Sequence, residues 1–364
     1  PRSKLPIHQE NRPMNRAAAV LAAGVALSVV ATPILAQRSG GGRPSRQCIQ
    51  EIMNLCGRDR SQIPACLQSK ADQLSDNCRN QVASRVRERR GEQAGAFQRA
   101  VKPTRTVFYG SDERQQIDVF EPEGAVDELP LVLFVHGGGW RMGSHKMVGQ
   151  KPAHFGTSEI YFASTGYRVL PGAPVEEQAR DVGAALQALR GQAGAIGFDP
   201  ERIVLMGHSA GAHLAALVAS DPQYAGSAFD AIEGVILLDG AGYDVPANIA
   251  ASEARASEVM ASQALNLYRE VFSEDPERQR ALSPITHVGG EDAPQWLALY
   301  VEERDVAKAQ AESLVNALNA AGSKAEAVSI ANTDHGRMNR ELGTEAGSAQ
   351  TQAVDAFLAE VFGS

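Results

Sequence analysis

Two glycine-rich strings in this 364-residue chain have residue types and a spacing that could carry out nucleophilic chemistry. The second string, GHSAG at residues 207–211, holds Ser209 between the apolar runs IVLM and AHLAALVA. A serine on a sharp turn between a strand and a helix is lifted clear of the sheet, where its hydroxyl can attack a carbonyl carbon. The first string, HGGGW at residues 136–140, follows the apolar run LPLVLFV. Its backbone N–H groups could bind the oxygen that becomes negative during such an attack, so the pair of strings predicts a serine hydrolase.

The residues around Ser209 then have expected roles of their own. His136 and His208 occupy motif positions without a proton-transfer role, and we expect them to brace their loops through hydrogen bonds. Trp140 has two open interpretations, since it could line an acyl pocket or pack beneath the oxyanion loop. The expected oxyanion donors are the backbone N–H groups of Gly138, Gly139 and Ala210.

The elements that must position these residues alternate between strand and helix. From about Thr104 onward, short apolar runs alternate with longer amphipathic ones, which indicates βαβ units and a mostly parallel sheet. A helix is expected from about Glu176 to Arg190. The expected strands are VFYG and QQIDVFEP as an initial hairpin, then LPLVLFV, YRVL, RIVLM, GVILLDG, QWLALYVE and AEAVSI. This order predicts an α/β-hydrolase fold over residues 104–364.

A serine nucleophile needs a histidine as general base, and in this fold the order along the chain is serine, acid, histidine. His335 is the expected base, because it lies in the polar segment ANTDHG after the last apolar run. His213 lies on the helix directly after Ser209, where its geometry is wrong. His287 is an alternative that could instead be a polar residue satisfied in a loop.

The acid is harder to assign from the sequence. Asp305 is the expected acid, because it ends the run LALYVEERD and precedes the amphipathic run AKAQAESLVNAL. Asp239, after the run GVILL, is an alternative, and so are Glu302 and Glu303. Asp239 could also serve only to cap its loop.

Composition narrows the class of protein. A hydrophobic content of 43% is ample for a packed core, and the formal charge of −8 argues against a general affinity for nucleic acid or anionic membranes.

The N-terminus has the pattern of a secretory signal. Residues 14–36 join a small basic region to the apolar stretch AAAVLAAGVALSVVATPILA, with Ile34 and Ala36 in suitable positions before a cleavage site. We expect translation to begin at Met14 and residues 1–13 to lie outside the mature protein. Cleavage would leave a net charge of −11 and a periplasmic or secreted protein without integral membrane association. The alternative is an uncleaved anchor of about twenty residues.

All four cysteines lie within residues 48–82, which we call the cysteine module, before an expected linker at residues 83–103. An exported chain meets an oxidising compartment, so two disulfides are expected. A zinc site is disfavoured, because the four cysteines contain no C-x-x-C spacing. Helical periodicity on both sides of Pro64 predicts a hairpin. Opposed helices favour nested pairing among the three connectivities, namely Cys48 with Cys78 and Cys56 with Cys66. Through its C…EI…C…IPACL…L…C pattern the module resembles one cysteine-rich repeat of a Golgi sialoglycoprotein.

From about Thr104 to Phe362 the chain resembles bacterial esterases that carry HGGGW, a group near hormone-sensitive-lipase-like carboxylesterases, feruloyl-esterase-like enzymes and kynurenine formamidases. The strings YGSDERQQIDVFEP, HGGGWRMGSHK and GFDPERIVLMGHSAGAHLAAL carry the likeness. The resemblance implies a metal-free, cofactor-free hydrolase of carboxylic esters with the roles given above. The chain departs from its relatives at YRVLPGAPVEEQARDV, and residues 243–284 are expected to form a small helical cap with few aromatic side chains.

Two classes of function follow. The first is an exported carboxylesterase for small or short-acyl esters, of which an aryl-formamide amidase is the nearest variant. The second is an interaction protein, in which the cysteine module recruits an unidentified partner and the hydrolase fold is a scaffold. Retention of Ser209, Asp305 and His335 favours the enzyme.

Overall fold

The computed structural model of this chain describes residues 45–57, single residues and short runs between 66 and 81, and residues 101–125 and 128–363. The chain divides into two compact units, Pro1–Glu88 and Arg89–Ser364. We call the second the hydrolase unit. The expected signal peptide at residues 14–36, residues 1–13 before it and most of the linker at residues 83–103 lie outside the described residues.

The cysteine module contains helix α1 (Arg46–Cys56), which begins after Ser45. The Ser45 hydroxyl accepts the backbone N–H of Cys48 at 3.2 Å, a hydrogen bond typical of a helix N-cap. Disulfides join Cys48 to Cys78 and Cys56 to Cys66, which is the nested pairing that a helical hairpin predicts. With Leu74, the buried Cys48–Cys78 pair forms the small core of this unit.

The hydrolase unit is built on one eight-stranded sheet in the order β1-β2-β4-β3-β5-β6-β7-β8. β1 and β2 form the expected antiparallel hairpin, β2 pairs antiparallel with β4, and all later pairs are parallel. The strands are β1 (Arg105–Phe108), β2 (Gln116–Phe120), β3 (Leu129–Val135), β4 (Tyr161–Thr165), β5 (Phe198–His208), β6 (Ile232–Leu238), β7 (Gln295–Val301) and β8 (Lys324–Ile330). This arrangement confirms the predicted α/β-hydrolase fold.

One predicted strand is wrong. The run YRVL, residues 167–170, is not a strand, and the preceding residues YFAST form β4 instead. Sheet pairing ends at Thr165, which faces Ile117 of β2. Beyond it the chain crosses to the HGGGW loop, where the Tyr167 hydroxyl donates to the carbonyl of His136 at 2.7 Å and the Leu170 N–H donates to the carbonyl of Trp140 at 2.9 Å. Tyr167 is buried and stacks on the ring of His136, whereas Val169 and Leu170 are half-buried.

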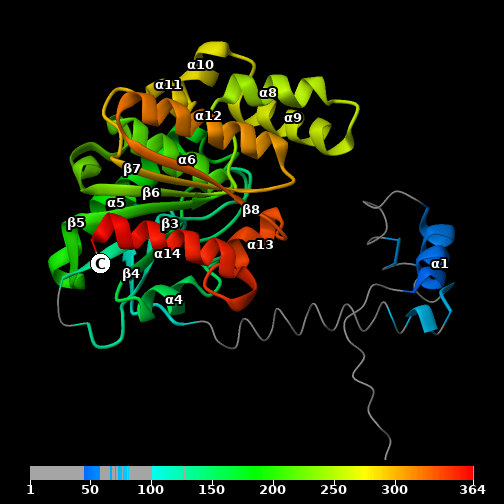
Figure 1. The fold of residues 1–364 in the computed structure, drawn as a ribbon, viewed down its shortest axis with the longest axis horizontal. Coiled ribbons are helices and arrows are strands. Elements are labelled where there is room, and N and C mark those ends of the chain that lie inside the picture. Colours follow the sequence, from blue (N-terminus) through cyan, green and yellow to red (C-terminus); the bar gives the residue numbers. More distant parts are fainter. Residues whose placement is uncertain are drawn as a thin grey trace, which may run out of the picture. The chain divides into compact units, whose positions relative to one another are not determined.

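Helices cover both faces of the sheet because successive residues of a strand point to opposite sides. On one face, Leu131 and Leu133 of β3 pack with α5 (Val175–Ile196), α6 (Ala210–Ser220) and α12 (Asp305–Ala321). On the other, Val132 and Phe134 pack with α4 (Lys151–Thr157) and α14 (Ser348–Phe362). Figure 1 shows this three-layer arrangement, with α6 and α12 on one side of the strands and α4 and α14 on the other. Shorter elements connect the layers: α7 (Pro222–Ala225), the 3₁₀ helices Gly226–Ala231 and Glu345–Gly347, and α13 (His335–Arg340).

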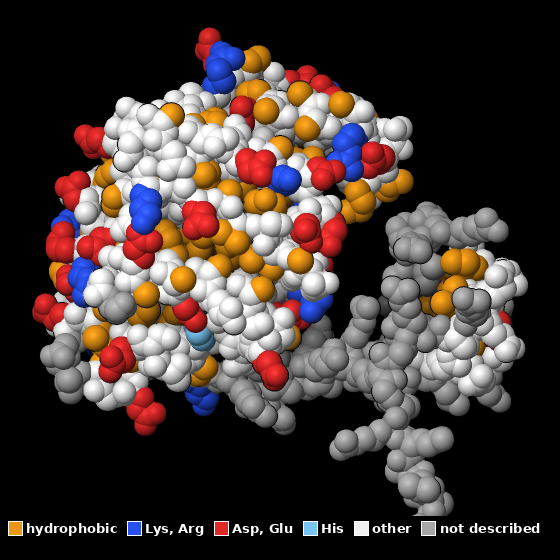
Figure 2. All heavy atoms as spheres, in the orientation of Figure 1, with side chains coloured by type: hydrophobic (Ala, Val, Ile, Leu, Met, Phe, Trp, Pro, Cys, Tyr) orange, Lys and Arg blue, Asp and Glu red, His pale blue; other side chains and the backbone are white. Residues whose placement is uncertain are grey.

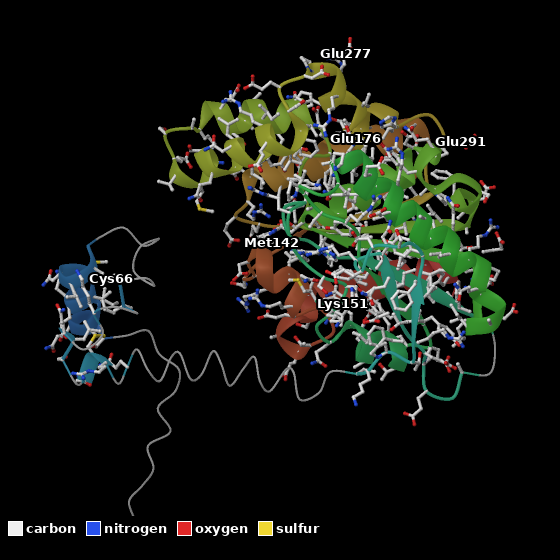
Figure 3. The ribbon with its side chains drawn as sticks, turned by 180° about the vertical axis from the view of Figure 1, so that it is seen from behind. Cys66, Met142, Lys151, Glu176, Glu277 and Glu291 are labelled. Carbon is white, nitrogen blue, oxygen red and sulfur yellow. A yellow bond between two sulfur atoms is a disulfide. The ribbon has the colours of Figure 1, made fainter. Side chains whose placement is uncertain are left out.

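The segment between β6 and β7 is helical, as expected for residues 243–284. It contains α8 (Val245–Ala254), α9 (Val259–Phe272), α10 (Pro276–Ala281) and α11 (Pro284–His287), which we call the cap helices. Arg278 of α10 pairs with Glu176 of α5 at 2.6 Å, and Glu176 lies beside these helices in Figure 3. Arg141, directly after the HGGGW loop, pairs with Glu270 of α9 at 2.9 Å. These ion pairs tie the cap helices to α5 and to the segment after the HGGGW loop.

Within the described part of the chain, no helix combines the length and the apolar character needed to cross a membrane. On the face of the hydrolase unit seen in Figure 2, Asp and Glu side chains are interspersed with Lys and Arg side chains and are not gathered by sign.

Candidate active site

Ser209 lies on the turn between β5 and α6, with a positive φ of 56° that a residue with a side chain rarely adopts. Glycines at positions 207 and 211 let the backbone of this turn pack closely against its neighbours. A Cβ at Gly207 would collide with the backbone of Gly211, and a Cβ at Gly211 would collide with the carbonyls of Val135 and His136. The Ser209 N–H donates to the carbonyl of Leu238 at 3.1 Å, so β6 also holds the turn. The strained turn is the nucleophile elbow that the sequence predicts.

His335 lies within hydrogen-bond distance of the serine, with 2.9 Å between its Nε2 and Ser209 Oγ. It is the first residue of α13, and the Asp334 side chain caps this short helix by accepting the N–H of Arg337 at 2.8 Å. His208 Nε2 lies 2.8 Å from the carbonyl oxygen of His335 and donates to it. The residue beside the nucleophile thus fixes the backbone of the histidine, which is the bracing expected of His208.

The carboxylate next to His335 belongs to Asp239, whose Oδ2 lies 2.6 Å from His335 Nδ1. Asp239 follows β6, and its side chain is fully buried. Its N–H donates to the carbonyl of Leu299 at 2.7 Å, and its Oδ1 accepts the N–H of Val301 at 3.1 Å. Burial alone would raise the pKa of Asp239, but the hydrogen bond from His335, the charge of Arg304 and the Val301 N–H together hold that pKa below its ordinary value.

The structure therefore corrects the expected acid. Asp305 is an exposed first residue of α12 that lines a surface groove of about 610 Å³ together with Asp244 and Arg255. Glu302 and Glu303 are exposed on the turn before it. Asp239 is the alternative that the structure places against His335. Asp239 directly follows β6 and is held by the backbone of Leu299 and Val301 in β7, whereas Asp305 lies beyond the turn after β7, at the start of α12.

Arg304 is a site residue that the sequence analysis missed. Its Nη1 contacts the Asp239 carboxylate and lies 2.8 Å from His335 Nδ1. Its side chain is 39% exposed. An arginine among two glutamates and an aspartate on a turn is typical of a solvated surface, so the sequence holds no signal that marks it.

The HGGGW loop, residues 136–140, lies beside the elbow. A Cβ at Gly137 would stand 3.0 Å from the Cβ of Ser209. Gly138 and Gly139 have φ values of 135° and 60°, which favour glycine. Within the described residues, no hydrogen bond uses the backbone N–H of Gly138, Gly139 or Ala210. These three groups are thus available as donors near Ser209.

Trp140 packs beneath the loop, which decides between its two interpretations. Its side chain is buried and meets the rings of Tyr268 and Phe272 edge-on, at centroid distances of 5.6 and 5.0 Å. Its carbonyl accepts the side-chain amide of Gln178 at 3.0 Å. Its indole N–H donates to His213 Nδ1 at 3.3 Å. The cap helices and α5 together hold the loop in place.

Three buried histidines support this site as neutral rings. Burial lowers the pKa of His136 to about 4, of His208 to about 3 and of His213 to about 4. His136 Nδ1 donates to the carbonyl of Gly137 at 2.8 Å, which is the bracing expected of it. His213 Nε2 donates to the carbonyl of Leu282 at 2.8 Å, so its Nδ1 is left to accept the Trp140 indole.

A stability prediction follows for His213. Its pKa is lower in the folded than in the unfolded chain, so its stabilising contribution is present above about pH 6.5 and is lost as the pH falls towards about 4. Replacing it by Gln removes this titration. Urea unfolding at both pH values should show that His213→Gln loses about 3 kcal/mol less stability between them than wild type does. The half-buried His287→Gln should lose as much as wild type; equal losses in His213→Gln would contradict the prediction.

No group of three or more His, Cys, Asp or Glu side chains among the described residues is arranged to hold a metal ion.

Comparison with known proteins agrees with the geometry. A family model for the alpha/beta hydrolase fold matches residues 132–339. Carboxylesterase NlhH of Mycobacterium tuberculosis is 35% identical over 118 residues, which are 32% of this chain and 36% of that protein. Probable isoprenylcysteine alpha-carbonyl methylesterase ICMEL1 of Arabidopsis thaliana is 31% identical over 112 residues, which are 31% of this chain and 24% of that protein. These alignments thus span about a quarter to a third of the relatives' length.

Two further similarities are longer. Kynurenine formamidase of Danio rerio is 26% identical over 242 residues, which are 65% of this chain and 77% of that protein. The solved structure of the apo form of Thermogutta terrifontis esterase 2 has a TM-score of 0.56 at 22% identity and covers 71% of this chain and 94% of that one. At this identity the structural likeness shows the fold. The family match does not extend to the cysteine module.

Proposed function

Since this chain belongs to the alpha/beta hydrolase fold family, we propose that it is a serine carboxylesterase that hydrolyses small or short-acyl carboxylic esters. The observation that carries the proposal is the line of contacts from Ser209 Oγ to His335 Nε2 at 2.9 Å and from His335 Nδ1 to Asp239 at 2.6 Å. A serine hydroxyl is a weak nucleophile until a positioned base takes its proton. The similarity to carboxylesterase NlhH supports the same chemistry.

In the proposed mechanism, His335 Nε2 takes the proton of Ser209 as Oγ attacks the ester carbonyl carbon. The carbonyl oxygen becomes negative and accepts hydrogen bonds from the N–H groups of Gly138, Gly139 and Ala210. Asp239 keeps the proton of the neutral ring on Nδ1 and stabilises the charged ring. His335 then gives the proton to the leaving alcohol. In the second half of the reaction His335 takes a proton from a water molecule, which attacks the acyl carbonyl carbon. His335 returns that proton to Ser209 Oγ as the acid leaves.

Short acyl groups fit the surroundings of the loop. The rings of Trp140, Tyr268 and Phe272 fill the space beneath it. Leu267 of α9 comes within 3.5 Å of a Cβ built on Gly139, so a side chain of the cap helices stands over the loop. We expect this packing to favour short acyl groups. The similarity to a protein named as a methylesterase supports a carboxylic ester as substrate.

Hydrolysis of p-nitrophenyl esters of increasing acyl length tests this proposal, with the Ser209→Ala variant as the blank. We expect kcat/KM to be highest for the shortest acyl groups and to fall as the chain grows, because the filled space beneath the loop excludes longer chains. A kcat/KM that rises toward the longest ester would contradict a short-acyl enzyme. Turnover that the Ser209→Ala variant retains would contradict the serine mechanism.

The second candidate is an aryl-formamide amidase. The observation that favours it is the length of the similarity to kynurenine formamidase, which spans 77% of that protein. Both candidate functions use the same triad, so variants of the triad do not distinguish them. Measuring kcat/KM for an aryl formamide and for an aryl acetate under the same conditions does. We expect the acetate to be hydrolysed with the higher kcat/KM.

We also propose that the protein is exported and acts in the periplasm or outside the cell. The proposal rests on the signal-peptide pattern of residues 14–36, which lie outside the described residues. N-terminal sequencing of the protein recovered outside the cytoplasm should begin at Gln37. An N-terminus that retains residues 14–36 would indicate an anchor instead.

A further inference from the structure

Arg304, on the turn between β7 and α12, touches both partners of the acid–base pair. Its Nη1 lies 2.8 Å from His335 Nδ1 and 3.4 Å from the carbonyl oxygen of Asp239, and it pairs with the Asp239 carboxylate. We propose that Arg304 is a positioning residue that limits how much positive charge the His335 ring carries during the reaction. This inference rests on the proposed function and deepens it.

The carboxylate oxygen is shared between two donors. Asp239 Oδ2 accepts from His335 Nδ1 at 2.6 Å and also pairs with Arg304. The other oxygen, Oδ1, is held by the Val301 N–H, and the Asp239 N–H is held by Leu299. Asp239 therefore keeps its place through backbone contacts, and Arg304 is not needed to orient it. What Arg304 adds is a charge.

The charge of Arg304 destabilises the positively charged His335 ring that forms during the reaction. When His335 takes the proton of Ser209, the ring becomes positive beside a guanidinium that already neutralises Asp239. The charged ring of the transition state is therefore less stable than it would be without Arg304.

His208, Tyr243 and Tyr268, which face this pair, stay neutral from about pH 5 to about pH 9. Burial lowers the pKa of His208 to about 3, and it raises the pKa of Tyr243 and of Tyr268 above the ordinary tyrosine value. Lys151, shown in Figure 3, has a pKa lowered by burial to about 7 and acts on His208. Lys151 is the same in every variant compared below, so it cannot produce a difference between them.

The test measures the rate at which an alkyl fluorophosphonate modifies Ser209 in the full chain, from about pH 5 to about pH 9. His335 Nε2 takes the serine proton, the Oγ–P bond forms, the P–F bond breaks and fluoride leaves. The variants are Arg304→Gln, which removes the charge, and Arg304→Lys, which keeps it. Arg337→Gln is the matched control, because Arg337 lies on α13 with the same 39% exposure and pairs with Glu341.

We expect Arg304→Gln to react about fivefold to tenfold faster than wild type on the high-pH plateau, because the positive ring of the transition state no longer faces the guanidinium. Arg304→Lys should follow wild type within about twofold, and so should Arg337→Gln. Mass spectrometry of the peptide that contains Ser209 confirms the site of modification.

A merely structural role for Arg304 predicts a slower Arg304→Gln at every pH, and that result would overturn the proposal. Profiles that coincide would overturn it as well. Failure of the proposed function has a different signature, since Ser209 could be modified by the fluorophosphonate while no carboxylic ester is hydrolysed. If wild-type Ser209 is not modified at all, that result would contradict both the proposed triad and this inference.

Discussion

Asp239→Asn is expected to lower kcat for ester hydrolysis about 10⁴-fold. An amide at this position offers an NH₂ group where the carboxylate accepts the His335 Nδ1 proton at 2.6 Å. The ring would then carry its proton on Nε2, facing Ser209, where it cannot act as a base. KM should change little, because Asp239 is buried and does not meet the substrate. Steady-state kinetics on a short-acyl p-nitrophenyl ester measures both constants.

Asp305→Asn is the matched control, because it makes the same chemical change at the acid that the sequence predicts, at the start of α12. We expect its kcat to stay within about twofold of wild type, since Asp305 lies in the groove beside α8 and not at the histidine. A large loss in Asp305→Asn with little loss in Asp239→Asn would mean that the working enzyme uses the acid expected from the sequence, and that the arrangement described here is not the active one.

Gly138→Ala is expected to lower kcat by about 10² to 10³, with a smaller effect on KM. Gly138 has a φ of 135°, and a Cβ there would collide with the carbonyl of Met142. The loop would have to shift to admit the methyl group, and its N–H would move away from the oxyanion. Because the lost hydrogen bond is strongest in the transition state, the loss appears mainly in kcat.

Gly191→Ala supplies the control for this variant. Gly191 lies in α5, and a Cβ there meets no atom within 4 Å. Adding the same methyl group in a helix should leave kcat unchanged and stabilise the protein slightly. Thermal unfolding of both variants separates a displaced loop from a damaged fold. A Gly138→Ala enzyme with wild-type kcat would show that this N–H is not an oxyanion donor.

Much of the hydrolase fold could be predicted from the sequence, because most strands from β3 onward are short apolar runs followed by a helix. The failure at residues 167–170 has a physical cause. YRVL is apolar enough for a strand, yet it makes hydrogen bonds to the HGGGW loop, and sequence alone does not distinguish pairing with a loop from pairing in a sheet. The strand order was also beyond the sequence, since pairing depends on contacts between distant segments.

The site divides in the same way. Ser209 and the glycine-rich loop lie within local motifs, and His335 follows from chain order. Asp239 and Asp305 both come after a strand, so the sequence pattern does not separate them. The contacts of Asp239 with Leu299, Val301 and His335 join distant segments of the chain and cannot be read from the sequence. Arg304 and Gln178 act through contacts across the fold, so neither belongs to a local pattern.

The backbone of Ser209 has a consequence for how this protein can change over evolutionary time. A side chain at a φ of 56° and a ψ of −122° costs of the order of 1–3 kcal/mol, which a glycine at the same position would avoid. A sequence selected for folding alone would therefore replace the nucleophile, and thermal stability and turnover favour different residues at this position. Drift toward a scaffold would be expected to begin here, with a more stable protein that no longer reacts.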